Sequence, residues 1–210
     1  RYVDETYASD GQLETFSVHY PDNFNFGYDV VDDIAVNDPD RRAMLWCNPE
    51  GEEHIFTFAD MKRWSDKTAN FLVDQGIKRG DYVLVVLRRH YQFWFVATAL
   101  AKIGAVMVPA TFMLKEHDLE YRLNGASISS IICTSVGDIA QIADNVISEC
   151  HTVTSRILVN GAGGGLTRRD EDGNLIAVAG TVGAALSGEE GICAASIERE
   201  GWVDFNSGVR

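Results

Sequence analysis

The segment that most constrains the fold of this chain is residues 80–123, with the sequence GDYVLVVLRRHYQFWFVATALAKIGAVMVPATFMLKEHDLEYRL. Within it, residues 82–87 are aromatic, aliphatic or β-branched without a polar interruption, which is typical of a strand covered on both faces. Such strands occur in parallel sheets, because the crossover helices cover both faces of the sheet. The segment therefore predicts a parallel β-sheet.

A buried helix and a second strand are predicted after this strand. Residues 91–103 are apolar nearly all round, and Gly104 stands where a helix can end in the left-handed backbone conformation. Residues 105–108 predict a short strand that Pro109 ends, since proline has no N–H group to donate to a neighbouring strand. Together these elements predict one β-α-β unit, whose crossover is almost always right-handed.

The region before this unit predicts a hairpin and an amphipathic helix. Residues 42–47 and 54–58 are strand-like and flank the turn sequence Asn-Pro-Glu-Gly. Thr57 followed by Asp60 resembles a capping box, and apolar residues then recur at steps of three and four. We therefore expect a helix that begins directly after the hairpin and ends near residue 75.

The region after the unit continues the alternation of strands and helices. Residues 130–133 and 156–159 predict two more buried strands. The helix between them is expected to begin at a cap formed by Ser135 and Asp138. The sequence therefore predicts an α/β fold with a layered, mainly parallel sheet, flanking helices and a glycine-rich loop or hairpin in the C-terminal part. The four tryptophans are expected to anchor the core: Trp46, Trp64, Trp94 and Trp202.

Charge and cysteine content narrow the class of protein. The chain has 18 basic and 31 acidic residues and a net charge of −13, which argues against nucleic acid or an anionic membrane as the main partner. No membrane span is expected, because residues 91–114 are interrupted by Lys102, Gly104 and Pro109. The cysteines show no metal-ligand spacing: Cys47, Cys133, Cys150 and Cys193. We expect reduced, mostly buried thiols, no metal site and a cytoplasmic protein.

A series of motifs in residues 80–123 resembles a known family. The motifs are, in order, G-D-x-V-x-V-V-L-x-R, an aromatic pair containing Trp, x-A-x-x-x-G-A, V-P-A-T and K-x-x-D-L-x-Y-R-L. Together they resemble the N-terminal domain of AMP-forming acyl-CoA synthetases, and most of all the medium-chain acyl-CoA and acetyl-CoA synthetase branch. The resemblance runs from about residue 24 to about residue 159, with a last trace at residues 201–205, GWVDF.

The resemblance also implies a domain organisation. Residues 1–25 are interpreted as an N-terminal arm that lies over the surface of the domain. Residues 26–210 are interpreted as a partial N-terminal domain of such a synthetase, with a glycine-rich insertion at about residues 160–200 that the family usually replaces by far fewer residues. In a partial domain we expect an uncovered apolar sheet face, which would drive self-association.

The activity implied by the resemblance is the activation of a short- or medium-chain carboxylate. ATP, with Mg²⁺, would convert the carboxylate into an acyl-adenylate, and CoA would then displace AMP. Phosphate chemistry of this kind requires a Gly/Ser/Thr loop, a lysine and a carboxylate for the metal. Residues 161–165 are glycine-rich but lack a following Lys-Ser/Thr, so we interpret them as a loop. We therefore assign no catalytic residue, and none of the five histidines is given a catalytic role. We expect this chain alone to be inactive and to bind neither ATP nor CoA tightly.

Three residues are candidates for contact with CoA in the intact enzyme. Arg88 and Arg89 follow the C-terminal end of the central strand, where open α/β sheets place ligands, and a guanidinium group can bind a phosphate. The alternative is that both form surface ion pairs with acids. In the medium-chain branch a polar residue, usually glutamine, touches CoA from the loop after the V-P element, and Met113 holds that position here. The alternative for residues 112–114 is that they simply cover the sheet.

Two other interpretations stay open. The chain is alternatively a non-catalytic α/β binding or interaction module derived from such an enzyme. A reading frame that ends near Arg210 favours the module, whereas one that continues into a Gly/Ser/Thr loop favours the ligase. A doubly wound nucleotide-binding domain of another kind is disfavoured, because no glycine fingerprint follows residues 42–47 or 82–87.

Overall fold

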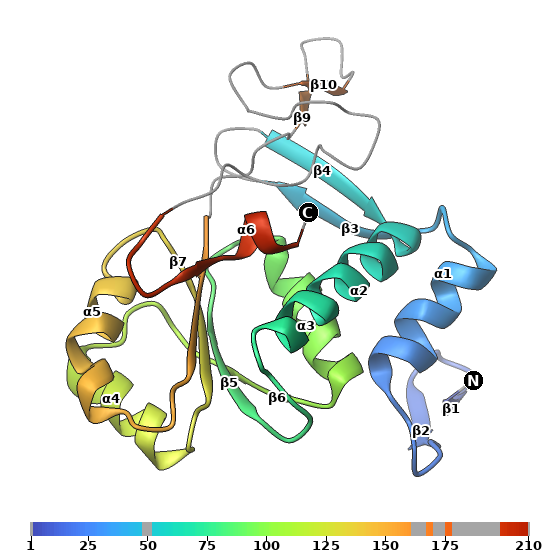
Figure 1. The fold of residues 1–210 in the computed structure, drawn as a ribbon. Coiled ribbons are helices and arrows are strands. Elements are labelled where there is room, and N and C mark those ends of the chain that lie inside the picture. Colours follow the sequence, from blue (N-terminus) through green and yellow to red (C-terminus); the bar gives the residue numbers. More distant parts are fainter. Residues whose placement is uncertain (1, 48–51, 161–166, 170–174, 178–197, 210) are drawn as a thin grey trace.

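A five-stranded, fully parallel sheet forms the centre of the computed structural model (Figure 1). The structure describes residues 2–47, 52–160, 167–169, 175–177 and 198–209. The strand order is β11-β8-β7-β5-β6. The strands are β5 (Tyr82–Val86), β6 (Val106–Pro109), β7 (Ser130–Thr134), β8 (Ser155–Val159) and β11 (Val203–Asp204). The predicted parallel sheet and its β-α-β unit are confirmed.

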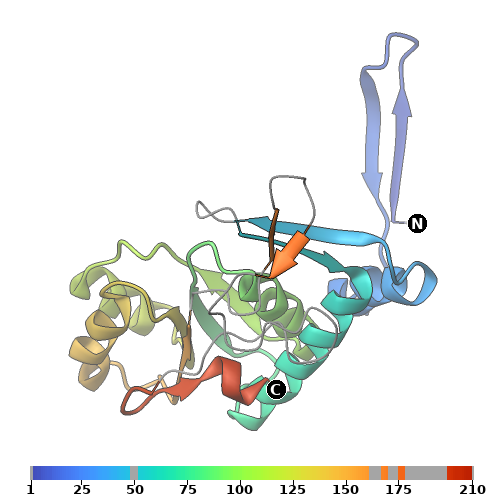
Figure 2. The ribbon, with the colours of Figure 1, turned by 90° about the horizontal axis from the view of Figure 1, so that it is seen from above.

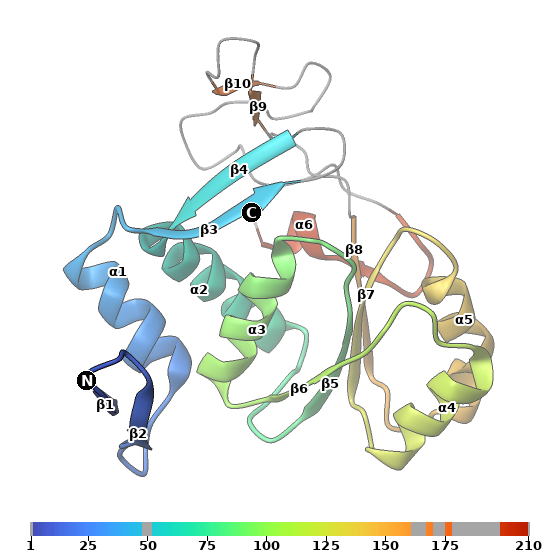
Figure 3. The same cartoon turned by 180° about the vertical axis from the view of Figure 1, so that it is seen from behind.

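Helices cover both faces of this sheet (Figures 1 and 3). The helices α2 (Phe58–Asp74) and α3 (Gln92–Ile103) lie on one face, and α4 (Glu116–Gly125) and α5 (Ile139–Val146) lie on the other. Val83 and Val85 of β5 join the hydrophobic core beside α2 and α3, whereas Leu84 and Val86 join the core beside α4 and α5. The expected uncovered face is therefore absent from the described part of the parallel sheet, because each face has its own helical layer.

The helix boundaries confirm two of the three predicted signals. The Asp60 N–H donates to Thr57 Oγ1 at 3.2 Å and the Thr57 N–H donates to Asp60 Oδ2 at 3.0 Å, which completes the capping box of α2. Gly104 ends α3 with a φ of +75°. The cap predicted for α5 is wrong, because that helix begins after Asp138 without a side-chain cap. Ser135 instead donates its backbone N–H to Val159 O at 2.9 Å, which extends the β7–β8 pairing.

A second, antiparallel sheet lies beside the first. The predicted hairpin is confirmed as β3 (Arg42–Cys47) and β4 (Glu52–Thr57). The short strands β9 (Thr167–Arg169) and β10 (Leu175–Ala177) extend it in the order β10-β9-β4-β3. A hairpin is thus present in the glycine-rich region, whereas the glycine run at 161–165 lies outside the described residues.

The N-terminal residues form a ribbon that projects from the body of the molecule (Figure 2). It consists of β1 (Val3–Tyr7) and β2 (Leu13–Val18), and every residue of both strands is exposed. The expectation that this arm lies over the domain surface is wrong for residues 3–18. The ribbon leads into η1 (Gly27–Asp32), a π-helical segment, and α1 (Asp33–Asn37), which pack beside α2 and α3. The remaining short helices are η2 (Ile147–Glu149), a 3₁₀ helix, and α6 (Phe205–Gly208).

The tryptophans and cysteines divide between the core and the surface. Trp64 and Trp202 are buried as predicted, and Trp46 is half-buried. Trp94 is 53% exposed, so its predicted place in the core is wrong; it lines a groove on the outer side of α3. Cys133 and Cys150 are buried and Cys47 is exposed, and all three are free thiols. In the part of the chain that the structure describes, no helix is both long and apolar enough to cross a membrane.

A cluster of charges around the buried Lys102 joins η1, α2 and α3. The Lys102 Nζ lies 2.7 Å from Asp32 Oδ1 and 2.6 Å from Asp66 Oδ1, and the Lys102 side chain is 1% exposed. Lys62 Nζ lies 2.6 Å from Asp66 Oδ2 and 3.4 Å from Asp32 Oδ2. Two ammonium groups therefore alternate with two carboxylates. Ion pairs of Lys102 thus connect α3, the helix that is almost wholly apolar in sequence, to η1 and α2.

Candidate functional site

The parallel sheet has a topological switch point between β5 and β7. These neighbouring strands are followed by helices on opposite faces of the sheet, α3 after β5 and α5 after β7. The loops that leave the carboxyl ends of two such strands diverge, and ligands of open α/β sheets bind in the resulting crevice. The residues concerned are 87–91 after β5 and 135–138 after β7.

A buried histidine and a threonine connect the two strands at this point. His90 Nε2 lies 3.0 Å from Thr134 Oγ1, and both residues are buried. Thr134 Oγ1 also accepts a hydrogen bond from the Val136 N–H at 3.0 Å. The threonine hydroxyl is therefore free to donate its own hydrogen to Nε2, which leaves the proton of a neutral imidazole on Nδ1. Burial, together with the nearby charge of Arg88, lowers the pKa of His90 to about 4, so the ring is neutral at pH 7.

Two further contacts hold the loop after β5 from either side. Trp46 of β3 donates its indole N–H to Arg89 O at 2.6 Å. On the other side the guanidinium carbon of Arg88 lies 4.2 Å from the centre of the Phe112 ring, a cation–π contact. The loop is thus fastened to the antiparallel sheet, to β7 and to the loop that follows β6.

The structure places the three candidate residues for CoA at the carboxyl ends of β5 and β6. Both arginines are exposed, and among the described residues neither has a carboxylate partner. Met113 is 69% exposed and follows Phe112, so the cation–π contact brings Arg88 and the Met113 loop together. The alternative that residues 112–114 cover the sheet holds for Leu114, which is buried in the core beside α4.

A groove with a volume of about 780 Å³ opens beside this loop, between β3, α2 and α3. Most of its surface is apolar. Among the described residues that line it, Arg88 and Arg89 are the charged ones, and no carboxylate is present. The remaining lining residues are Phe26, Val31, Ala43, Met44, Leu45, Trp46, Cys47, Phe58, Met61, Leu87, His90, Phe93, Trp94 and Thr98. This lining suits an apolar partner that carries negative charge.

Comparison with known sequences decides the family. The family described as AMP-binding enzyme matches residues 31–175, which is more than half of the chain. The chain belongs to this family. The mitochondrial acyl-coenzyme A synthetase ACSM4 of Mus musculus is 32% identical over 146 residues, which make up 67% of this chain and 25% of that protein. ACSM5 of Rattus norvegicus is 34% identical over 146 residues, with the same shares of 67% and 25%. The predicted resemblance to acyl-CoA synthetases is confirmed, and the chain spans about a quarter of the length of these relatives.

Solved structures confirm the fold. The anthranilate CoA ligase AuaEII, in complex with anthranoyl-AMP, matches 90% of this chain and 28% of its own with a TM-score of 0.60 and 16% identity. A fatty acyl CoA synthetase of Mycobacterium tuberculosis matches 64% of this chain and 26% of its own with a TM-score of 0.57 and 24% identity. The α/β layering of this AMP-binding enzyme family member is therefore that of adenylate-forming synthetases.

Sequence reasoning missed His90, Thr134 and the groove. The five histidines share no spacing, so none of them is singled out by the sequence, and Thr134 lies just after the strand predicted at residues 130–133. A usable signal was present, because His90 lies in the loop that follows the apolar strand β5 and Thr134 ends the buried strand β7. Polar side chains in such places meet when the two strands are neighbours, as β5 and β7 are.

We predict that the buried His90 makes stability depend on pH. Its pKa is about 4 in the folded chain against a usual 6.5, so the unfolded chain takes up the proton first as the pH falls. Stability is fully present above about pH 6.5 and is lost towards pH 4, by up to about 3 kcal/mol. Urea titrations at pH 7 and pH 4 should show a larger loss for the wild type than for His90→Gln. Equal losses would show that His90 is not held neutral.

Proposed function

We propose that this chain is the N-terminal part of an AMP-forming acyl-CoA synthetase that activates a short- or medium-chain carboxylate. The intact enzyme would form an acyl-adenylate from ATP and the carboxylate, and then transfer the acyl group to CoA. The observation that carries the proposal is the family match over residues 31–175, on a parallel sheet of the matching fold. The exposed arginines at the switch point are in keeping with a nucleotide-containing ligand.

CoA is the ligand whose chemistry suits the described residues. Arg88 and Arg89 offer exposed guanidinium groups at the carboxyl end of β5, where they can bind a phosphate of CoA. Met113 would contact the same molecule from the neighbouring loop. We propose no site for the triphosphate of ATP among the described residues, which include no group of three or more His, Cys, Asp or Glu side chains placed to hold a metal ion. No step of adenylation is therefore assigned to this chain.

The test is a comparison between this 210-residue chain and the product of its complete reading frame. We expect the latter to convert carboxylates into CoA thioesters with release of AMP and pyrophosphate, and the 210-residue chain alone to form no thioester. A reading frame that ends near Arg210, with a product that forms no thioester, would favour the non-catalytic binding module instead. The cytoplasmic location stays a prediction, since the relatives above are named as mitochondrial proteins.

A single substitution tests the place of Met113. We predict that Met113→Gln lowers the KM for CoA of the complete enzyme by about threefold to tenfold, because an added amide can form a hydrogen bond worth roughly 0.5–1.5 kcal/mol. The control is Met113→Leu, which keeps an apolar side chain and should leave this KM unchanged. An equal effect of both substitutions on the KM for CoA would contradict the proposal that Met113 lies in the CoA site.

A further inference from the structure

The projecting ribbon has two chemically different faces. The antiparallel register places Val3 opposite Val18 and Glu5 opposite Phe16 and, after an irregularity that skips Glu14, Tyr7 opposite Leu13, so these paired side chains share one face. The large apolar members of this face are all about half exposed: Val3, Tyr7, Leu13, Phe16 and Val18. We call these five residues with Glu5 the ribbon face. It is an amphipathic surface without any cover in the described chain.

The opposite face of the ribbon is polar and satisfied within the chain. The hydroxyl groups of Thr6 and Thr15 lie 2.7 Å apart, and His19 Nε2 lies 2.7 Å from Asp4 Oδ2. Ser17 Oγ lies 3.2 Å from the same histidine nitrogen. This face is therefore the one that solvent covers. A two-stranded hairpin alone is marginally stable in water, so the ribbon face needs a partner.

The groove described above has the complementary chemistry. Its walls are mostly apolar, and its charged lining consists of Arg88 and Arg89, in a chain whose net charge is −13. The ribbon brings apolar side chains and the carboxylates of Glu5, Asp10 and Glu14. The ribbon points away from the body of its own chain, so it does not reach the groove of the same molecule (Figure 2).

We propose that the ribbon face docks into the groove of a second copy of this chain, and that two copies exchange their ribbons. Five apolar side chains that are half exposed offer roughly 500 Å² of surface. Two reciprocal contacts would bury on the order of 1,400 Å² in total, which lies in the range of stable interfaces. A two-fold axis makes both contacts identical, as in most homodimers. This inference does not rest on the proposed enzymatic activity, but it uses Arg88 and Arg89, so the docked ribbon and CoA would compete for these two side chains.

The first test is sedimentation velocity of the 210-residue chain at tens of micromolar, without ATP or CoA. We expect a dimer for the wild type and a monomer for Phe16→Ser on the ribbon and for Trp94→Ser in the groove. Thr15→Ser, on the polar face of the ribbon, is the matched control and should remain a dimer. Thermal unfolding of each variant checks that the domain is still folded.

A charge exchange tests the pairing itself. Glu5→Lys alone, or Arg88→Glu with Arg89→Glu, should weaken the dimer by about tenfold or more, because like charges then face each other. All three substitutions together should restore it. A monomeric wild type would overturn the proposal. So would a dimer that Phe16→Ser dissociates but Trp94→Ser leaves intact, because the ribbons would then pair with one another.

Discussion

Replacement of Lys102 by methionine is expected to lower the free energy of unfolding by about 2–4 kcal/mol, because it leaves the largely buried Asp32 and the partly exposed Asp66 with one cation fewer. Lys102 is fully enclosed and reaches Asp32 and Asp66 at 2.7 and 2.6 Å. Burial alone would raise the pKa of Asp66, but hydrogen bonds from Lys102 and Lys62 outweigh burial and hold it below its usual value. Urea unfolding at pH 7 measures the loss directly.

The matched control is Lys62→Met, which removes the same charge from the same cluster. Lys62 is 39% exposed and contacts the same two carboxylates, so water screens its ion pairs. We expect a loss of about 1 kcal/mol or less for this variant. Similar losses for the two variants would mean that burial of Lys102 is not what makes its ion pairs important.

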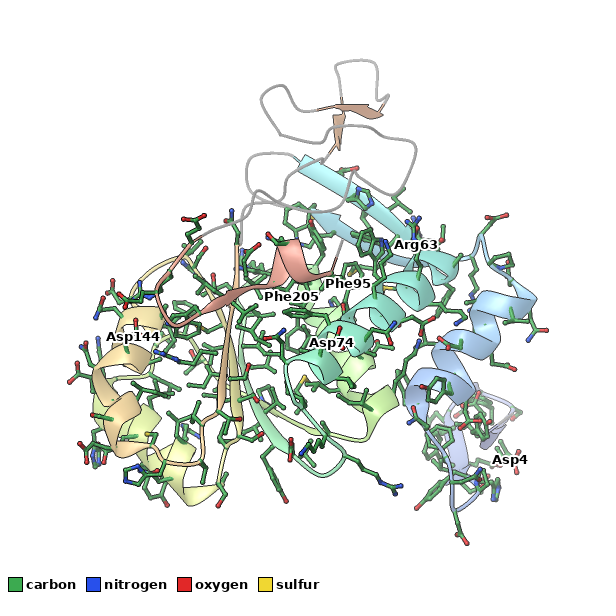
Figure 4. The ribbon with its side chains drawn as sticks, in the orientation of Figure 1. Asp4, Arg63, Asp74, Phe95, Asp144 and Phe205 are labelled. Atoms are coloured by element: carbon green, nitrogen blue, oxygen red, sulfur yellow. The ribbon has the colours of Figure 1, made fainter. Side chains whose placement is uncertain are left out.

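Replacement of Phe95 by alanine is expected to cost about 3–5 kcal/mol of unfolding free energy, the usual effect of emptying an aromatic site in a packed core. Phe95 is 1% exposed and lies in the interior (Figure 4). Its ring centre lies 5.5 Å from that of Phe56, 6.0 Å from that of Trp64 and 5.8 Å from that of Tyr91. The substitution therefore opens a cavity in the core between α3, α2 and β4.

The neighbouring residue provides the control for Phe95. Trp94→Ala removes an even larger side chain from the same helix, but one that is more than half exposed. We expect a loss of about 1 kcal/mol or less, since little of that surface is buried within the chain. The midpoints of thermal unfolding of the two variants should differ by several degrees. A larger loss of stability for Trp94→Ala would contradict the placement of Phe95 in the core and of Trp94 in the groove.

Local signals in the sequence were sufficient to predict most of the helices and strands. The uninterrupted apolar run of β5 predicted a strand covered on both faces, and its alternate residues do enter two different cores. Thr57 with Asp60 predicted the start of α2, and Gly104 the end of α3, because both signals act within one helical turn. The predicted cap at Ser135 does not form, and the backbone N–H of Ser135 is instead hydrogen-bonded to Val159 O at the end of the β7–β8 pairing.

The site and the charge cluster depend on contacts that are distant in sequence. His90 meets Thr134 across 44 residues, and Lys102 meets Asp32 across 70 and Asp66 across 36. These contacts exist because β7 lies beside β5 rather than beside β6, and because η1 packs on α2 and α3. Strand order is not encoded in local patterns. The sequence therefore predicted that Arg88 and Arg89 lie at a strand end, but it did not predict which residues lie beside them.

Calorimetric titration of the 210-residue chain with Mg²⁺·ATP, and separately with CoA, tests most directly whether this chain carries only part of a synthetase site. We predict no saturable heat with Mg²⁺·ATP, because the glycine-rich residues 161–165 are not followed by the Lys-Ser/Thr of a triphosphate-binding loop, and no tight binding of CoA. Saturable binding of Mg²⁺·ATP would contradict the proposal, since the chain would then hold a complete nucleotide site by itself.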